Sequence, residues 1–167
     1  MILFSDRLYV RQYTLEDEEA FYRLNSDEEI MRYIRPAKNR QESKAFLLEN
    51  LQFYKDHPNL GRWALIEKST SQLVGTFSLL PLEHTTNIHI GYALMKEYWG
   101  KGYASEIVKA GMTYAFNQLG LPSLVAITYP EHLVSQKVLL RNGFHPEGVY
   151  NDGGKDSLLF RINRGIN

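Results

Sequence analysis

The chain has 167 residues, of which 44% are hydrophobic and 23% are charged, and this composition predicts a single globular domain over residues 1–167. Its 19 basic and 19 acidic side chains cancel, so charge gives no reason to expect a nucleic acid or a membrane surface as a partner, and no apolar run is long enough to span a bilayer. The chain has no cysteine, which excludes disulfides, thiolate metal ligands and thiol nucleophiles, and its first residues lack the layout of a signal peptide, so a cytoplasmic location is the simplest expectation.

Helix signals dominate the first third of the chain, after one strand. Residues 7–13 alternate polar and apolar side chains, which is typical of a strand. Thr14, with Asp17 three positions later, has the pattern of a capping box and predicts the start of a helix. A short helix is expected over residues 27–33, ahead of a proline, and a longer one over residues 41–56.

Strand signals dominate the middle of the chain. The segments 63–67, 73–80 and 87–95 are rich in apolar residues and are joined by short polar connections. This arrangement predicts an antiparallel meander. The segment 87–95 is short and apolar and is followed by charged residues, a pattern typical of a buried strand.

The most informative stretch follows that strand and has the sequence Tyr98-Trp99-Gly100-Lys101-Gly102-Tyr103-Ala104-Ser105-Glu106. Apolar residues recur after it at helical spacing until Gly120, so this glycine loop should open a helix. Glycine lets a backbone turn tightly and approach a ligand, and the first N–H groups of a helix have no partners within the helix. Lys101 adds a full positive charge beside them. The loop therefore predicts a site for a phosphate or a pyrophosphate.

The last third of the chain predicts a crossover and a hairpin. A β-branched strand over residues 124–129 follows the helix, so it should run parallel to the strand over 87–95. A helix over 133–141 comes next, and strands over 143–150 and 156–162 then form a hairpin. The expected fold is α+β: a mixed, mostly antiparallel sheet of about seven strands with one central parallel pair, flanked by helices. A crevice is expected where the parallel pair ends.

Three segments between Arg7 and Arg164 point to a known family. They are Ile90-Gly91-Tyr92 together with the glycine loop, then Ser135-Gln136-Lys137-Val138-Leu139 with Arg141-Asn142-Gly143-Phe144, and finally Gln72-Leu73-Val74-Gly75-Thr76. In this arrangement they resemble the GNAT family of acetyl-CoA-dependent N-acyltransferases, in the form of its ribosomal-protein (alanine) N-acetyltransferase branch. The resemblance implies that the parallel pair splays and that the pantetheine arm of acetyl-CoA completes the crevice.

The resemblance also implies which residues bind CoA. The matching positions are Leu94, Met95, Lys96, Gly100, Lys101, Gly102, Tyr103, Ala104, Ser105, His132, Ser135 and Lys137. Backbone N–H groups near Leu94 would polarise the thioester carbonyl. The chain departs from the usual pattern at His89, where this branch usually has glutamate, at His132, where the family usually has asparagine, and at Leu139, where many relatives have tyrosine. It also has Glu97 where the broad family motif has Gln or Arg, although this branch often has an acid there.

His89 is the candidate general base. It shares a strand face with Gly91 and Ala93 by the two-residue period, and these small residues leave room for a ligand. A neutral imidazole, whose ordinary pKa is ~6.5, can accept the proton of an attacking amine directly or through a water. The alternative is a half-exposed strand histidine that faces solvent.

Ser135 is the candidate donor to the departing thiolate, a role proposed for serine in this branch. The alternative is an ordinary serine in the first turn of a helix. Tyr103 and Tyr129 are rival donors, because a phenol in a loop or at a strand end can reach a thiol.

Two further groups of residues have a functional and a structural interpretation. One group consists of three aromatic residues that either line an acceptor pocket or belong to the core: Tyr33, Trp63 and Phe77. The other group consists of three basic residues that either flank the entrance of the acceptor pocket or form a solvated face: Arg32, Arg35 and Lys38.

The sequence thus predicts direct transfer of an acetyl group from acetyl-CoA to a primary amine, on a protein amino terminus or a small molecule, by a monomer or a homodimer. No Gly-x-Ser-x-Gly elbow offers a serine nucleophile, and His84, His89 and His132 lack metal-ligand spacing. One alternative is a CoA-binding sensor or interaction domain without turnover. Another is a nucleotide-dependent oxidoreductase, whose Rossmann loop would need a glycine where Ser105 stands.

Overall fold

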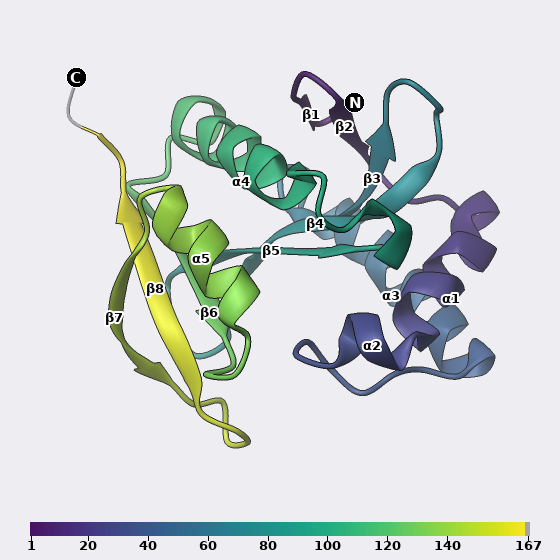
Figure 1. Cartoon of the computed structure of the whole chain (residues 1–167). Coiled ribbons are helices and arrows are strands. Elements are labelled where there is room, and N and C mark those ends of the chain that lie inside the picture. Colours follow the sequence, from purple (N-terminus) through teal and green to yellow (C-terminus); the bar gives the residue numbers. More distant parts are fainter. Residues whose placement is uncertain (166–167) are drawn as a thin grey trace.

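The structure is a computed structural model that describes residues 1–165, and its centre is one open sheet of eight strands (Figure 1). The strands are β1 (Leu3–Phe4), β2 (Leu8–Arg11), β3 (Gly61–Glu67), β4 (Leu73–Pro81), β5 (Ile88–Leu94), β6 (Ser123–Thr128), β7 (His145–Tyr150) and β8 (Ser157–Asn163). Their order across the sheet is β1-β2-β3-β4-β5-β6-β8-β7. Within residues 1–165 every neighbouring pair is antiparallel except β5 and β6.

This sheet confirms the expected α+β fold with one central parallel pair. About seven strands were expected, and the eighth is β1, which has only two residues. A strand that short has no periodicity to detect. The predicted domain of 1–167 extends two residues beyond the part of the chain that the structure describes.

Five α-helices flank the sheet. They are α1 (Glu18–Ser26), α2 (Glu28–Met31), α3 (Arg40–Asp56), α4 (Tyr103–Thr113) and α5 (Leu133–Arg141). A 3-10 turn, η1 (Leu15–Asp17), precedes α1, and the Thr14–Asp17 capping box is present there. A second capping box, between Asn39 and Glu42, begins α3 one residue earlier than expected. The helix after the glycine loop ends in a π-helical segment, η3 (Tyr114–Gln118).

The helices divide between the two faces of the sheet. Trp63, Phe77 and Ile90 point to the face that carries α4 and α5, and they form the larger core with Ile107 and Val138. On the opposite face, the side chains of α1 and α3 pack against Ala64 and Ile66 of β3. Figure 1 shows α4 and α5 side by side in front of the sheet, with α1, α2 and α3 gathered at the other end of β5. No helix within residues 1–165 combines the length and apolar character that crossing a bilayer requires.

Candidate active site

The central parallel pair separates soon after it forms. Strands β5 and β6 share a single register pair, His89 with Val125, and then diverge (Figure 1). The N–H group of Met95 donates to the Val74 carbonyl on the β4 side, at 2.8 Å. Because backbone groups alternate in direction along a strand, the N–H groups of Tyr92 and Leu94 point to the other side, where β6 has moved away. The split therefore exposes backbone donors in the middle of the sheet.

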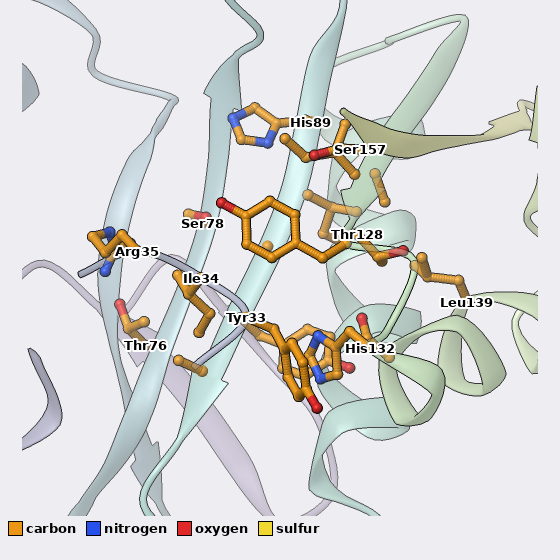
Figure 2. A pocket seen from close by; sticks show the side chains of 18 of the residues that line it. Tyr33, Ile34, Arg35, Thr76, Ser78, His89, Thr128, His132, Leu139 and Ser157 are labelled. Atoms are coloured by element: carbon orange, nitrogen blue, oxygen red, sulfur yellow. The ribbon is translucent and has the colours of Figure 1, made fainter. Parts of the chain in front are cut away.

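A cavity of about 270 Å³ lies at this split. From the face of α1 and α3 it is lined by side chains that include Arg62, Thr76, Ser78, His89 and Ala93. From the face of α4 and α5 it is lined by side chains that include Tyr92, Val108, Ser135 and Leu139. In Figure 2, Arg35, Thr76 and Ser78 lie at one side of the cavity, with His132 and Leu139 at the opposite side. The cavity thus connects the two faces of the molecule through the sheet.

The glycine loop lies at the amino-terminal end of α4. Gly100 and Gly102 have φ angles of 75° and 80°, a left-handed backbone that side chains other than glycine rarely adopt. Gly102 is the N-cap of α4 and no side chain caps the helix there, so its first N–H groups remain for a ligand. The Lys101 ammonium lies 5.1 Å from the centre of the Tyr98 ring. This backbone geometry is the one that an anion site requires, and the site itself stays a prediction.

Several side chains of the predicted CoA-binding set have structural partners instead. Tyr103 is buried, and its hydroxyl hydrogen-bonds to Glu67. The Ser105 hydroxyl accepts a hydrogen bond of 3.0 Å from Asn142, which ties the first turn of α4 to the end of α5. Met95 is buried against α1 and α2, and the Lys96 ammonium pairs with Asp27 and Glu29, each at 3.2 Å. These positions are available to a ligand mainly through their backbone.

The remaining predicted CoA-binding residues differ in position. Leu94 ends β5, and its carbonyl accepts a hydrogen bond of 2.8 Å from the Trp99 indole. Ala104 is partly buried against the larger core. His132 lines the cavity and stacks on Tyr33, with ring centres 4.7 Å apart. Lys137 is exposed on α5 and does not line the cavity.

His89 lines the cavity on the same face as Gly91, as its strand period predicts. A Cβ at Gly91 would meet the Ser78 hydroxyl at 2.9 Å, so glycine keeps the floor of the cavity open here. Burial lowers the pKa of His89 to about 4, and the positive charge of Arg62 adds to this effect. The imidazole is therefore neutral at physiological pH, and it is a weaker base than an exposed histidine.

Ser135 is buried and lines the cavity with Tyr92. Burial raises the pKa of the Tyr92 phenol, and a hydrogen bond with Ser135 opposes that shift. The Thr128 hydroxyl, at the end of β6, is buried in the cavity wall and has no hydrogen-bond partner within residues 1–165. A buried polar atom that lacks a partner is costly, which suits a position that a ligand would satisfy.

Some candidate residues are not brought to the site. Trp63 and Phe77 are fully buried in the core on the α4 face, so their side chains do not form an acceptor pocket. Tyr33 and Arg35 line the cavity, whereas Arg32 and Lys38 do not. Among residues 1–165, no group of three His, Asp or Glu side chains gathers where it could hold a metal ion.

The cavity residues that the sequence reasoning missed include Arg62, Tyr92 and Thr128. Arg62 is in register with Ser78, which is in register with Gly91, so all three share one face. Pairing across strands would have revealed it, but the register of a meander is not visible in one sequence. Tyr92 and Thr128 belong to strands that were expected, and the splay of β5 from β6 makes them accessible.

Comparison with known proteins decides the family. The family model described as an acetyltransferase (GNAT) domain matches residues 7–145. The chain belongs to the GNAT acetyltransferase family. It is also 32% identical over 152 residues to the uncharacterised N-acetyltransferase YoaA of Bacillus subtilis, covering 89% of this chain and 85% of that protein. The protein is thus an acyltransferase. The Rossmann alternative is wrong, because the glycine loop belongs to a GNAT fold, whose sheet within residues 1–165 has a single parallel pair.

Solved GNAT structures share the whole fold. A GNAT acetyltransferase from Bacillus anthracis superposes with a TM-score of 0.83 at 24% identity, covering 96% of this chain and 97% of that one. The ribosomal-protein-S5-alanine acetyltransferase of Vibrio fischeri gives 0.76 at 21% identity, with 96% of both chains covered. Mycobacterium smegmatis RimJ, solved in complex with CoA-disulfide, gives 0.79 at 20% identity, covering 96% of this chain and 86% of that one.

Proposed function

We propose that the protein transfers an acetyl group directly from acetyl-CoA to the nitrogen of a primary amine, and that the two substrates meet in the cavity between β5 and β6. One observation carries the proposal: the cavity passes through the split sheet, with the uncapped helix α4 nearby on one face and His89 on the other. A ternary reaction needs two substrates held in line from opposite sides. A passage through the sheet supports such an arrangement.

The residues on the α4 face fit CoA. The left-handed turn at Gly100 and Gly102 and the free first-turn N–H groups of α4 suit a pyrophosphate. The N–H groups of Tyr92 and Leu94, which face the split, suit an extended amide arm and the carbonyl of a thioester. The unpartnered Thr128 hydroxyl offers one further contact. The CoA complex of Mycobacterium smegmatis RimJ, a fold relative, supports the same choice of cosubstrate.

Two cavity residues are assigned to proton transfer. As the new C–N bond forms, the amine loses a proton, and neutral His89 accepts it directly or through a water. As the C–S bond breaks, the sulfur gains a proton, and Ser135 donates it, with Tyr92 as the neighbouring hydroxyl in the same wall. Tyr103 is a poor rival for this role, because its hydroxyl is engaged by Glu67. Tyr129 stays a rival, since it lines the cavity.

The acceptor on this proposal is a protein amino terminus or a small-molecule amine, and a cytoplasmic location and a monomer or homodimer stay predictions. The test is to incubate the protein with acetyl-CoA and a panel of amines, measuring free thiol and acetylated amine in the same samples. We expect equal amounts of both products, and no acetyl group retained on the protein in an intact mass spectrum. Tight CoA binding with no thiol release from any amine would instead indicate a CoA-binding sensor. Stabilisation by NAD(P) but not by acetyl-CoA in a melting experiment would contradict the cosubstrate.

A further inference from the structure

Two arginines line the cavity on the face opposite α4 and α5. Arg62 lies in β3, in register with Ser78 of β4, which is in register with Gly91 of β5. Arg35 lies in the connection between α2 and α3, and Figure 2 shows it beside Thr76 and Ser78. Both guanidinium groups stack on the same Phe46 ring, with Cζ at 4.6 Å from its centre for Arg62 and at 5.1 Å for Arg35. The Arg62 charge lies near enough to Arg35 to lower the pKa of its guanidinium group.

Among the residues that the structure describes, no carboxylate pairs with either arginine. Within residues 1–165, every ion pair uses other basic side chains, and neither Arg35 nor Arg62 forms one. Arg35 donates to the neutral Asn25 amide oxygen at 3.0 Å. The acidic residue that lines the cavity in the described part of the chain is Asp152, which lies in the β7–β8 turn and accepts a backbone hydrogen bond from Gly154.

Keeping two unpaired cations together in a cavity wall is unfavourable. Burial and the neighbouring Arg62 charge lower the pKa of Arg35 to about 10, and burial also lowers the pKa of Arg62. A bound anion would reverse both effects, because it supplies the missing charge and accepts the guanidinium N–H groups. Arginine is the side chain best suited to this task, since its planar fork matches a carboxylate or a phosphate.

We propose that Arg35 and Arg62 bind an anionic group of the acceptor, so that the acceptor is a small amine that also bears a carboxylate or a phosphate. This inference rests on the proposed function, because it assigns the substrate class of the same cavity. The cavity of about 270 Å³ is at the small end for ligand sites and suits an amino-acid-like molecule better than a folded partner. Arg62 and Gly91 are two strands apart, roughly 10 Å between backbones, and the long arginine side chain spans part of that distance. The anion and the reacting amine are thus separated by only a few bonds.

The test compares acceptors that differ only in that charge. Glycine and β-alanine are each assayed beside the corresponding amide, and glutamate beside its diamide, by thiol release from acetyl-CoA at one pH and low ionic strength. An aminoalkyl phosphonate and a simple alkylamine without an anionic group complete the panel. The phosphonate distinguishes a preference for a phosphate from one for a carboxylate. We expect kcat/KM to favour the anionic member of the preferred pair by about tenfold or more. The amide has the less basic amine, so amine reactivity alone would favour the opposite order.

Variants assign that preference to the arginines. Arg35→Gln and Arg62→Gln should each lower the ratio of kcat/KM for the anionic acceptor to kcat/KM for its amide about 10- to 100-fold. Arg35→Lys and Arg62→Lys keep the charge and should retain part of the preference. Arg40→Gln is the matched control, because Arg40 is exposed at the start of α3 and pairs with Glu19 outside the cavity. Melting temperatures show whether each variant is folded.

The outcomes separate this inference from the proposed function. Equal rates for acid and amide, or an equal loss for both in the glutamine variants, would overturn the inference while leaving acetyl transfer intact. If no amine releases thiol, acid and amide are titrated by calorimetry into the CoA-saturated protein. Acid binding that the glutamine variants abolish would then support the anion site although the proposed function fails. Absence of acid binding would overturn both.

Discussion

At the scale of single residues, the chemistry of the cavity depends on which side chains stay neutral. His89 is surrounded by the sheet and lies near the Arg62 charge, so its protonated form is disfavoured. In a plot of rate against pH, the fall in rate caused by protonation of His89 should therefore lie near pH 4 rather than ~6.5, the ordinary pKa of histidine. An anion bound at Arg62 would reduce the repulsion and raise the pKa of His89. Substrate binding would thus make the base stronger.

The first prediction concerns the pH dependence of stability at His89. Its pKa is lower in the folded protein than in the unfolded chain, so the unfolded chain binds more protons between pH ~6.5 and ~4. The stability that neutral His89 contributes is fully present above pH ~6.5, and it is lost as the pH falls through the pKa of His89 in the folded protein. We expect wild type to lose on the order of 1–2 kcal/mol more unfolding free energy than His89→Gln between pH 7 and pH 5. Urea titrations at both pH values measure it, and equal losses would mean that His89 is not shielded from solvent.

The same variant tests the proposed catalytic role. His89→Gln should lower kcat/KM at every pH between 6 and 9 without changing the shape of the profile, because only the amine titrates in that range. His89→Glu restores a carboxylate and should recover part of the rate. A glutamine variant as fast as wild type would assign the proton to water or to another side chain.

The second prediction concerns Ser135. If its hydroxyl protonates the departing sulfur, Ser135→Ala should lower kcat by about ten- to a thousandfold while the Kd for CoA stays within about twofold. Ser43→Ala is the matched control, because Ser43 is also a buried helical serine but does not line the cavity. Tyr92→Phe removes the neighbouring hydroxyl and shows whether the two act together. A loss of CoA affinity alone would make Ser135 a binding residue.

At the scale of elements, the glycine loop and α4 form one unit. The backbone turns twice through left-handed glycines, and the helix begins without a cap, so its amino-terminal N–H groups are open on the side of the loop. The side chains of the same stretch face inward or pair with neighbours, as the Tyr103–Glu67 and Asn142–Ser105 hydrogen bonds show. The loop is therefore held rigidly by its side chains while its backbone stays available. Such preorganisation lowers the entropic cost of binding.

The third prediction tests the loop backbone. Gly102→Val should weaken CoA binding at least tenfold, because a side chain at a φ of 80° strains the turn and crowds the phosphate site. Gly120→Val is the control, since Gly120 has a φ of 67° with open space around it and lies at the far end of the same helix. Both variants should lose stability, of order 1–3 kcal/mol. Isothermal calorimetry with CoA distinguishes them, and equal affinities for the two variants would move the pyrophosphate site elsewhere.

At the scale of the whole molecule, the strands pair on both sides of the sheet, whereas the central strands β5 and β6 separate after a single register pair. The meander of β3, β4 and β5, the crossover through α4 and the hairpin at the end of the chain were predictable, because they follow from periodicity and turn residues, whereas the position of β8 between β6 and β7 was not. The glycine loop was predictable for the same reason, since backbone conformation there depends on local residue type. His89 became a candidate through the strand period and the family resemblance, and Ser135 through the resemblance; both line the cavity, and their catalytic roles stay predictions.

The rest of the site depends on contacts between distant segments. Arg62 and His89 line the same cavity because β3, β4 and β5 pair in one register, and Arg35 joins them because the α2–α3 connection folds over that face. The low pKa of His89 arises from this assembly and is invisible in the sequence. The inward turn of Tyr103 and the pairing of Lys96 with α2 are tertiary effects in the same sense. Local patterns therefore indicate the loop and the fold, whereas the acceptor side requires the three-dimensional arrangement.

The central claim is that the split between β5 and β6 is the place where the two substrates meet. A crystal structure of the protein with CoA tests it most directly. The account predicts the pyrophosphate at the N–H groups of residues 100–105, the pantetheine arm along Tyr92 and Leu94, and the sulfur between Ser135 and His89. A CoA molecule bound outside the split, with its sulfur remote from both side chains, would contradict it.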